Sequence, residues 1–448
     1  MSDFIPPYPY RHRFSLKPLE TIKYLRKDLL SFWPEKAFSR NFITIKILTR
    51  SIFIANCPDA VEHVLVTHNS NYEKKSGLMR KTLAPLLAES LLISDGDIWK
   101  KHSQLIRPFF GSEQIAKFSE VMVKITEAFG QGWTDLPSNS SLPVVNEMKA
   151  LSAAILCRIL FGEGVDDKQN RQFVQSVDNY LTAIEDLDIN TFFGLPNWIP
   201  HFGGNNPSQT AKIVQNRIDK IIAAHSQAND TSLLGLFLSL PANTLSREQI
   251  RNELLSFFLA GYEPTANTLA WAWYLLAQCP EVELRLHNEI DSILVNGSAT
   301  IDDIPKLVYT RAIIDETLRL YPPFPMLSRQ AKGDDKFQNH TIPAGSLMLI
   351  VPWLLHRHQH FWKKPDHFIP ERFLEVAPDK PKPYTYLPFS FGARECVAKY
   401  MGTVQTTLCL AILAQRNRLQ TRPEETVKPI CKVILRPNND LPMDLIKR

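Results

Sequence analysis

The segment from residue 245 to residue 280 constrains the fold more than any other part of the chain. Ser246 and Gln249 have the spacing of a helix-capping box, and Pro280 is the stop signal at the other end. The predicted helix is therefore about 32 residues and ~48 Å long, enough to cross a whole domain. It is apolar nearly all round from Leu254 to Leu276, which predicts that it is buried.

Two residues that disfavour helices lie in the middle of this segment. Gly261 and Pro264 are both costly in a helix interior, and proline costs about 3 kcal/mol. Their presence in a buried central helix predicts a local kink that has a functional role.

The rest of the chain predicts a mainly α-helical protein with small β-sheets. Helical periodicity dominates, and 32 prolines against 17 glycines are typical of helices separated by stiff turns. Short β-like runs occur at 42–56 and 340–352. Because we find no repeat and no low-complexity linker, we expect one domain over 1–448 with a short proline-rich lead at 1–14.

Composition excludes several classes of protein. The 448 residues are 44% hydrophobic and carry a net charge of +5, so a large core is expected and nucleic-acid binding has no support. The six cysteines are scattered, which favours reduced thiols and a cytoplasmic location. Neither a signal peptide nor an apolar run long enough for a transmembrane anchor is present in the sequence.

A loop close to the C-terminus places Cys396 just before a predicted helix. Phe389, Gly392 and Arg394 precede this cysteine. Glycine lets the backbone fold back, neighbouring amides donate hydrogen bonds to sulfur, and an aromatic ring excludes water, so the set suits a metal-bound thiolate. The alternative for any single cysteine is a buried, inert side chain.

Two further segments carry charge. Glu316 and Arg319 lie three residues apart on one face of a predicted helix, and Arg372 follows in the loop FIPERF. Taken alone, such a helical pair is typical of a solvated ion pair worth about 0.2 to 0.5 kcal/mol.

Together these segments resemble the cytochrome P-450 superfamily, the haem-thiolate monooxygenases, in its soluble bacterial type. FSFGARECVA is similar to the haem-binding loop FxxGxRxCxG, which implies that Cys396 is the axial metal ligand, with Ala398 in the usual glycine position. ETLR matches the ExxR motif of the family. The resemblance therefore implies that Glu316, Arg319 and Arg372 form a cluster that holds the protein core together behind haem b. The resemblance also implies a single P-450 fold whose long central helix crosses the haem.

Other site residues follow from the same resemblance. It implies that Arg394, Arg329 and Trp99 contact the haem propionates, and that Phe389 and Gly392 shape the loop. Ser103 stands where the family often has Arg or His, and whether the preceding His102 replaces that contact stays open.

AGYEPT in the long helix is similar to the oxygen-activating AGx(D/E)TT. The resemblance implies that Gly261 leaves room for dioxygen and that Glu263 relays protons, with Thr265 secondary because Pro264 occupies the usual threonine position. The implied reaction inserts one oxygen atom from O2 into an organic substrate. The alternatives are a peroxide-dependent hydroxylase or isomerase on this fold, or a haem-thiolate protein that binds ligands without turnover.

The electrons must come from a separate partner, because no GxGxxG follows a strand and the chain has no room for a fused reductase. The resemblance implies that this partner is a ferredoxin or flavodoxin. We expect the acidic partner to bind at Lys100, Lys101 and Lys399; the alternative is that each is a solvated surface charge.

Segments that line the substrate pocket in the family are apolar here, which favours an apolar small molecule. They contain Phe192, Phe193, Trp198, Phe324, Met326 and Leu327. Three histidines, His356, His358 and His360, alternate as in a strand, but we do not expect a metal site there because no further ligand has suitable spacing.

Overall fold

The computed structural model describes residues 4–13, 24, 28–47, 50–73, 75, 77–185, 207–225, 230–295 and 297–448. It divides into two compact units. The larger unit contains residues 1–72, 118–152 and 263–448, and the smaller unit contains residues 73–117 and 153–262. The expectation of one domain over 1–448 stays a prediction.

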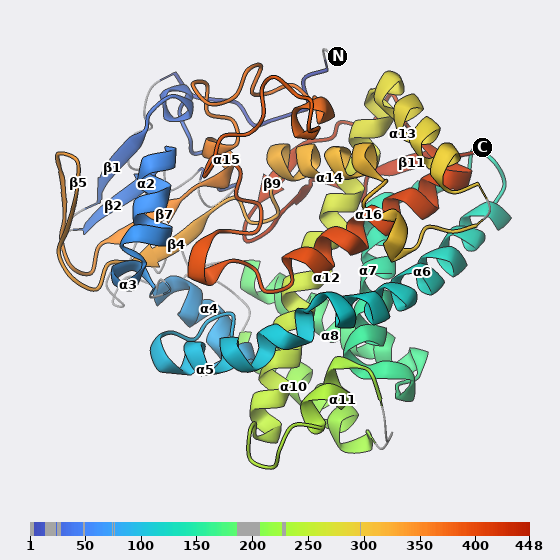
Figure 1. Ribbon diagram of the computed structural model, residues 1–448, viewed down its shortest axis with the longest axis horizontal. Helices are drawn as coiled ribbons and strands as arrows, with labels where there is room; N and C mark the ends of the chain where they lie inside the picture. Colours follow the sequence, from blue (N-terminus) through green and yellow to red (C-terminus); the bar gives the residue numbers. More distant parts are fainter. Residues whose placement is uncertain are drawn as a thin grey trace. The chain divides into compact units, whose positions relative to one another are not determined.

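Helices predominate over strands in the part of the chain that the structure describes (Figure 1). The α-helices before the central one are α2 (Pro58–Glu62), α3 (Asn69–Tyr72), α4 (Gly77–Leu87), α5 (Gly96–Ile106), α6 (Ser112–Asp135), α7 (Val144–Phe161), α8 (Asp167–Glu185), α10 (Pro207–Ala224) and α11 (Leu233–Leu238). The later ones are α12 (Arg247–Gln278), α13 (Pro280–Ile293), α14 (Val308–Leu320), α15 (Pro352–Leu355) and α16 (Lys399–Arg416). The prediction of a mainly helical fold with small sheets is confirmed.

The principal sheet of the larger unit has the strand order β1-β2-β7-β4. Its strands are β1 (Phe42–Ile47), β2 (Arg50–Ala55), β7 (Leu347–Ile350) and β4 (Leu327–Gln330). β2 pairs with β7 in parallel, and the other two pairs are antiparallel, so segments almost 300 residues apart in sequence lie side by side (Figure 1). Both β-like runs predicted from the sequence are therefore strands.

Three smaller sheets complete the strands described. They are β5 (Asp335–Phe337) with β6 (His340–Ile342), β9 (Pro429–Cys431) with β10 (Leu435–Pro437), and β3 (Ser141–Pro143) with β11 (Pro442–Lys447) and β8 (Asn417–Thr421). Short 3-10 or π turns lie between these elements, and two of them, η2 (His63–Thr67) and η7 (Gly392–Arg394), bear on the site.

The long helix α12 has the predicted length of 32 residues. Its capping box is formed: the Gln249 amide donates to Ser246 Oγ at 3.2 Å, and the Ser246 amide donates to Gln249 Oε1 at 2.9 Å. Pro264 lies within the helix, and the hydroxyl of Thr268 donates to the Pro264 carbonyl at 2.7 Å. The sequence signals at the start and end of α12 are thus confirmed, whereas the kink at Pro264 stays a prediction.

The proline-rich lead packs against the larger unit where the structure describes it, at residues 4–13. The hydroxyl of Tyr321 donates to the Pro7 carbonyl at 2.9 Å, and the Arg11 guanidinium bonds to Asp366 at 3.0 Å. Tyr321 lies at the end of α14, so the lead is tied to the helix that carries the ExxR motif.

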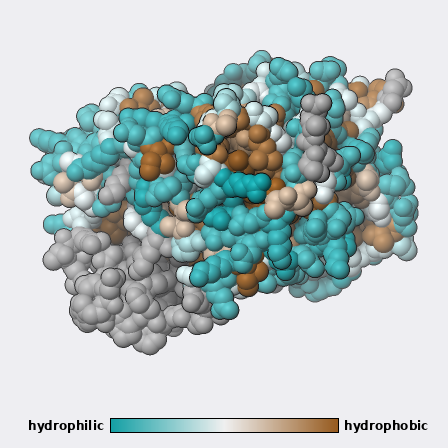
Figure 2. All heavy atoms as spheres, turned by 90° about the horizontal axis from the view of Figure 1, so that it is seen from below, coloured by the Kyte–Doolittle hydropathy of each residue, from teal (hydrophilic) through white to brown (hydrophobic). Residues whose placement is uncertain are grey.

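No helix among the described residues is both long and apolar enough to span a membrane. On the face shown in Figure 2, hydrophilic residues predominate and the hydrophobic ones form separate small groups. Scattered exposed apolar side chains of this kind are ordinary on a protein surface.

Candidate functional site

The loop before α16 holds Cys396 in a fixed backbone conformation. The Cys396 amide donates to the Phe389 carbonyl at 2.9 Å, and the Glu395 amide donates to the Gly392 carbonyl at 3.0 Å. Gly392 has a φ of +72°, and a Cβ there would lie 2.4 Å from the Leu65 carbonyl oxygen. Only glycine fits both conditions, so the predicted hinge of the loop is a steric requirement.

The thiol of Cys396 differs from the other cysteines. All six are free, and five are buried, whereas Cys396 is exposed. Its accessible side chain still lies among many protein atoms, and this burial raises the pKa of the Cys396 thiol, while a hydrogen bond from the Ala398 backbone lowers it. A thiolate here needs a cation, and a metal ion supplies one.

The three charged residues predicted to cluster do form one buried network. Arg319 makes two bonds to the Glu316 carboxylate, from Nε at 2.6 Å and from Nη2 at 2.8 Å. Both side chains are fully buried, and Arg372 Nε donates to Glu316 Oε1 at 3.4 Å. The reading as a solvated surface pair is therefore wrong, because tertiary packing encloses this face of α14.

Arg319 also holds the surrounding backbone. Its Nη1 donates to the carbonyls of His356 and Pro365, both at 2.7 Å, and its Nη2 donates to the His367 carbonyl at 2.9 Å. One buried guanidinium thus fixes several loop carbonyls that are far from it in the sequence.

His356 connects this network to the cysteine loop, which the sequence reasoning missed. Its Nε2 accepts a hydrogen bond from the Leu387 amide at 2.8 Å, and its Nδ1 lies 3.2 Å from the Arg319 carbonyl. Burial, followed by the charge of Arg319, lowers the pKa of His356 to about 3. The imidazole is neutral and both nitrogens are engaged, so His356 has a structural role.

The strand-like reading of His356, His358 and His360 is wrong. They follow the short helix α15 in a series of turns, with the first two buried and His360 exposed. Both nitrogens of His356 are engaged. The expectation that the three histidines form no metal site stays a prediction.

Glu263 on α12 is buried and ion-paired. Lys149 Nζ on α7 lies 2.9 Å from its carboxylate Oε1. No pattern near Glu263 in the sequence indicates this partner, although a charged residue on an otherwise apolar helix needs one. Thr265 is also buried. The roles of both residues in proton transfer stay predictions.

Gly261 permits a close approach between α12 and α7 within the smaller unit. A Cβ at this position would lie 3.3 Å from the side chain of Leu156, which is tighter than ordinary packing. Glycine is thus useful here for helix packing, and its role beside dioxygen stays a prediction.

The segment around Trp99 lies on α5 in the smaller unit. His102 Nδ1 lies 2.6 Å from the Glu253 carboxylate, and the Leu91 amide donates to both oxygens of that group. Burial raises the pKa of Glu253, while the His102 hydrogen bond opposes the shift. His102 is thus anchored to α12, and Ser103 Oγ accepts from Arg107 Nε at 2.8 Å.

The other predicted cofactor contacts belong to the larger unit. Arg329 is buried on β4, Arg394 is half-buried in η7, and Phe389 lies beside Gly402 of α16. The propionate contacts predicted for Arg329, Arg394 and Trp99 stay predictions.

The residues predicted to contact substrate or a redox partner differ in their exposure to solvent. Phe192, Phe193 and Trp198 lie outside the described residues, Phe324 is exposed, and Met326 and Leu327 are half-buried. Lys100, Lys101 and Lys399 are exposed, with Lys399 bonded to Glu395 at 2.8 Å and Lys100 lying 3.5 Å from Asp97. The roles of these residues toward substrate and redox partner stay predictions.

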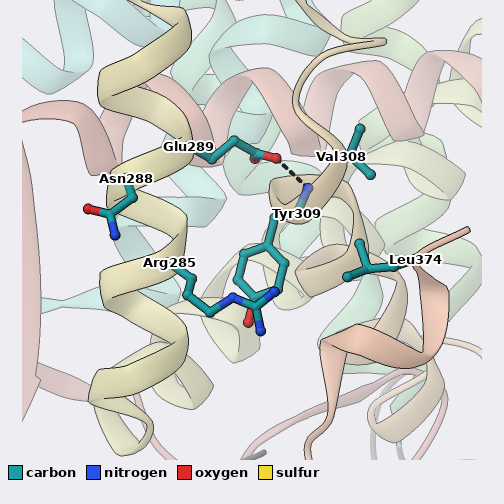
Figure 3. A pocket seen from close by; sticks show the side chains of 6 residues that line it. All are labelled: Arg285, Asn288, Glu289, Val308, Tyr309 and Leu374. Atoms are coloured by element: carbon teal, nitrogen blue, oxygen red, sulfur yellow. Dashed lines mark hydrogen bonds between the residues drawn. The ribbon is translucent and has the colours of Figure 1, made fainter. Parts of the chain in front are cut away.

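An open pocket of about 330 Å³ lies where α13 and α14 meet the 3-10 turn at Pro370–Phe373 (Figure 3). It is lined by Arg285, Asn288, Glu289, Val308, Tyr309 and Leu374. Glu289 accepts hydrogen bonds from the Tyr309 and Thr310 amides and so caps the start of α14. None of the lining residues is a predicted site residue, and the pocket is best described as a helix junction.

Comparison with known proteins identifies the family. The Cytochrome P450 family profile matches residues 17–442. Cyclooctatin synthase of Streptomyces melanosporofaciens is 29% identical over 87% of this chain and 85% of that protein. Cyclooctat-9-en-7-ol 5-monooxygenase of the same organism is 29% identical over 86% of this chain and 84% of that protein.

A solved structure shares the fold. The cytochrome P450DA heme domain aligns with a TM-score of 0.84 at 21% identity, covering 99% of this chain and 98% of that one. With the family match over nearly its whole length, the chain belongs to the Cytochrome P450 family. It is accordingly a P-450 monooxygenase whose cofactor is haem b.

The residues present fit this cofactor. A single exposed thiol, a glycine that no other residue can replace, and a backbone amide directed at the sulfur form the donor set of an axial thiolate. When bound, the haem supplies the activation of dioxygen. The protein's own residues fix the cysteine loop and place a paired carboxylate on α12.

Proposed function

We propose that this protein inserts one oxygen atom from O2 into an apolar organic molecule, with electrons from a separate ferredoxin or flavodoxin. The observation that carries the proposal is the exposed Cys396 thiol in a loop tied through Leu387 and His356 to the buried Glu316–Arg319 pair. In this proposal Cys396 is the axial ligand, and Arg329, Arg394 and Trp99 hold the propionates.

Within the apolar class, we propose a hydrocarbon-rich cyclic substrate. One relative is named as a monooxygenase of cyclooctat-9-en-7-ol, a cyclic alkenol. The apolar side chains predicted for the pocket support a ligand of this chemistry. A library of cyclic alkenes and alkenols, screened by the shift of the haem Soret band, tests this choice against fatty acids and planar aromatics.

The deciding experiment uses the purified haem-loaded protein with a surrogate ferredoxin, its reductase and NADH. We expect oxygen consumption and an oxygenated product when a compound that shifts the spectrum is added. Pro264 in the usual threonine position favours peroxide-dependent chemistry as the second candidate. Product formed only with added hydrogen peroxide would select that candidate.

Glu263→Gln is expected to slow NADH-supported product formation by about 100-fold or more, because a positioned proton donor contributes ~100-fold to 10,000-fold. Thr265→Ala should have a smaller effect. The measurement is product formed per NADH consumed, together with hydrogen peroxide released. Equal rates and coupling in Glu263→Gln and the parent would contradict the proton-transfer role of this carboxylate.

Lys149 is expected to position Glu263. Lys149→Met removes the cation 2.9 Å from the carboxylate, so we expect several-fold more peroxide per NADH and a changed solvent isotope effect on product formation. Lys149→Arg should restore both values, because it keeps the charge. Lys124→Met on the exposed face of α6 is the matched control. An unchanged isotope effect in Lys149→Met would show that the ion pair only stabilises the fold.

A further inference from the structure

A second group of potential metal ligands lies in the larger unit, away from the cysteine in the sequence. His63 begins the π turn η2, His68 follows that turn directly, and Asp335 begins β5. One ligand atom from each of the three residues lies within 4.8 Å of the others. The Cytochrome P450 reaction does not account for this group.

The carboxylate of Asp335 is held in a fixed orientation. His63 Nε2 lies 2.8 Å from its Oδ2, the Tyr72 hydroxyl donates to the same oxygen at 2.8 Å, and the Lys336 amide donates to Oδ1 at 2.7 Å. Burial acts to raise the pKa of Asp335, but the hydrogen bonds from His63 and Tyr72 outweigh it and the pKa is lowered. The hydrogen bonds from His63 and Tyr72 thus hold Oδ2 of Asp335 in a defined position beside His63 Nε2.

His68 presents a second imidazole to the same place. It is exposed, and its ring stacks on that of His63 with 3.9 Å between the centroids. The Thr67 hydroxyl donates to the His63 carbonyl at 3.3 Å and lies 3.2 Å from His68 Nδ1. Because a hydroxyl has one proton, its oxygen accepts from Nδ1–H, which leaves the lone pair on His68 Nε2.

We infer that His63, His68 and Asp335 form a binding site for a divalent transition metal of the Zn²⁺ type. Two imidazoles and one carboxylate are a donor set that zinc uses, with water in the remaining position. The metal replaces the proton on His63 Nε2, which is released to solvent. His68 turns its ring out of the stack so that Nε2 points at the ion, and its exposure leaves room for that rotation.

Such a metal would stabilise the turn η2, which contacts the cysteine loop. Leu65 lies between the two histidines in η2, and its carbonyl is the group that leaves no space for a Cβ at Gly392. Glu62 directly precedes His63 in the sequence. Its Oε1 accepts a hydrogen bond from the Tyr384 hydroxyl at 3.2 Å, and the Tyr384 ring contacts Phe391. The metal would thus link the β5–β6 hairpin to the turn on which the Cys396 loop rests.

The alternative is that His63, Tyr72 and Asp335 are only a hydrogen-bonded tie between η2 and β5. That tie needs no contribution from His68. This residue is exposed, and its ring bonds to the Thr67 hydroxyl and stacks on His63. His68 therefore separates the two readings, and its substitution leaves the buried part of the network intact.

The test is titration of the chelator-treated, haem-loaded protein with ZnCl2 by calorimetry at pH 7.5. We expect one saturable site with a micromolar or lower dissociation constant, weakened at least about tenfold in His68→Ala. His360→Ala, which removes another exposed histidine of the larger unit, should bind as the parent does.

A second measurement is the thermal midpoint, which a metal bound to the folded protein raises. Zn²⁺ should raise the thermal midpoint of the parent and of His360→Ala but not that of His68→Ala. Absence of a saturable site below about 100 µM, or unchanged Zn²⁺ affinity in His68→Ala, overturns the inference. Neither measurement needs a substrate or a redox partner, so the result is independent of the proposed oxygenation.

Discussion

Cys396→Ser is expected to remove the long-wavelength, thiolate-type Soret band of the ferrous carbonyl complex completely. That band depends on an anionic sulfur ligand, and a serine hydroxyl is far more difficult to deprotonate than a thiol. Cys396 is the one exposed cysteine of the six, so no other thiol of the chain is placed to replace it. The measurement is the carbonyl difference spectrum of purified protein, with circular dichroism to show that the variant is folded.

Cys279→Ser is the matched control for this experiment. Cys279 is buried and occupies the N-cap of α13, where serine is a favoured residue. We expect this variant to keep both its fold and the thiolate-type spectrum. A band that persists in Cys396→Ser, or disappears in Cys279→Ser, would contradict the ligand assignment.

The parts of the molecule that the sequence predicted are those specified by local signals. The start of α12 follows from Ser246 and Gln249, whose two reciprocal hydrogen bonds lie within one helical turn. The cysteine loop follows from Gly392, because its positive φ is a local backbone requirement. Neither feature requires knowledge of the rest of the fold to be predicted.

The parts that the sequence did not predict are contacts between distant segments. His102 and Glu253 are 151 residues apart, and the Leu387 amide and His356 are 31 apart. Nothing near Glu253 in the sequence indicates which residue will form a hydrogen bond with it. The sequence shows only that a charged side chain on the apolar α12 needs a partner. Tertiary packing selects that partner, so it becomes visible only in the structure.

The surface reading of Glu316 and Arg319 shows why spacing alone misleads. An i,i+3 pair looks the same in sequence whether solvent or protein covers it, and the two cases differ greatly in energy. Here the pair is fully buried and bonded to Arg372 and to loop carbonyls. Only the combination with the cysteine loop and PERF favoured the buried reading.

The greatest loss of stability is expected from Glu316→Gln, which keeps the size of the side chain and removes its charge. Arg319 and Arg372 would then be buried without their carboxylate, and breaking a buried ion pair costs about 3 to 5 kcal/mol. The measurement is the free energy of unfolding from urea titration, with haem content determined on the same preparation.

Arg311→Ala on the same helix is the matched control. It removes an i,i+4 pair in which Arg311 Nε lies 2.8 Å from Asp315 and the arginine is 36% exposed. Pairs of this kind contribute less than about 1 kcal/mol. The two variants therefore separate the effect of burying a charge from that of removing any ion pair on α14.

The loss in Glu316→Gln should extend to the cofactor. Without its carboxylate partner, Arg319 is no longer held where it donates to the His356 carbonyl, and His356 in turn accepts from the Leu387 amide at the start of the cysteine loop. We therefore expect low haem content in Glu316→Gln and normal content in Arg311→Ala. If Glu316→Gln unfolds at the same urea concentration as Arg311→Ala and retains its haem, the buried network neither stabilises the fold nor supports the Cys396 loop.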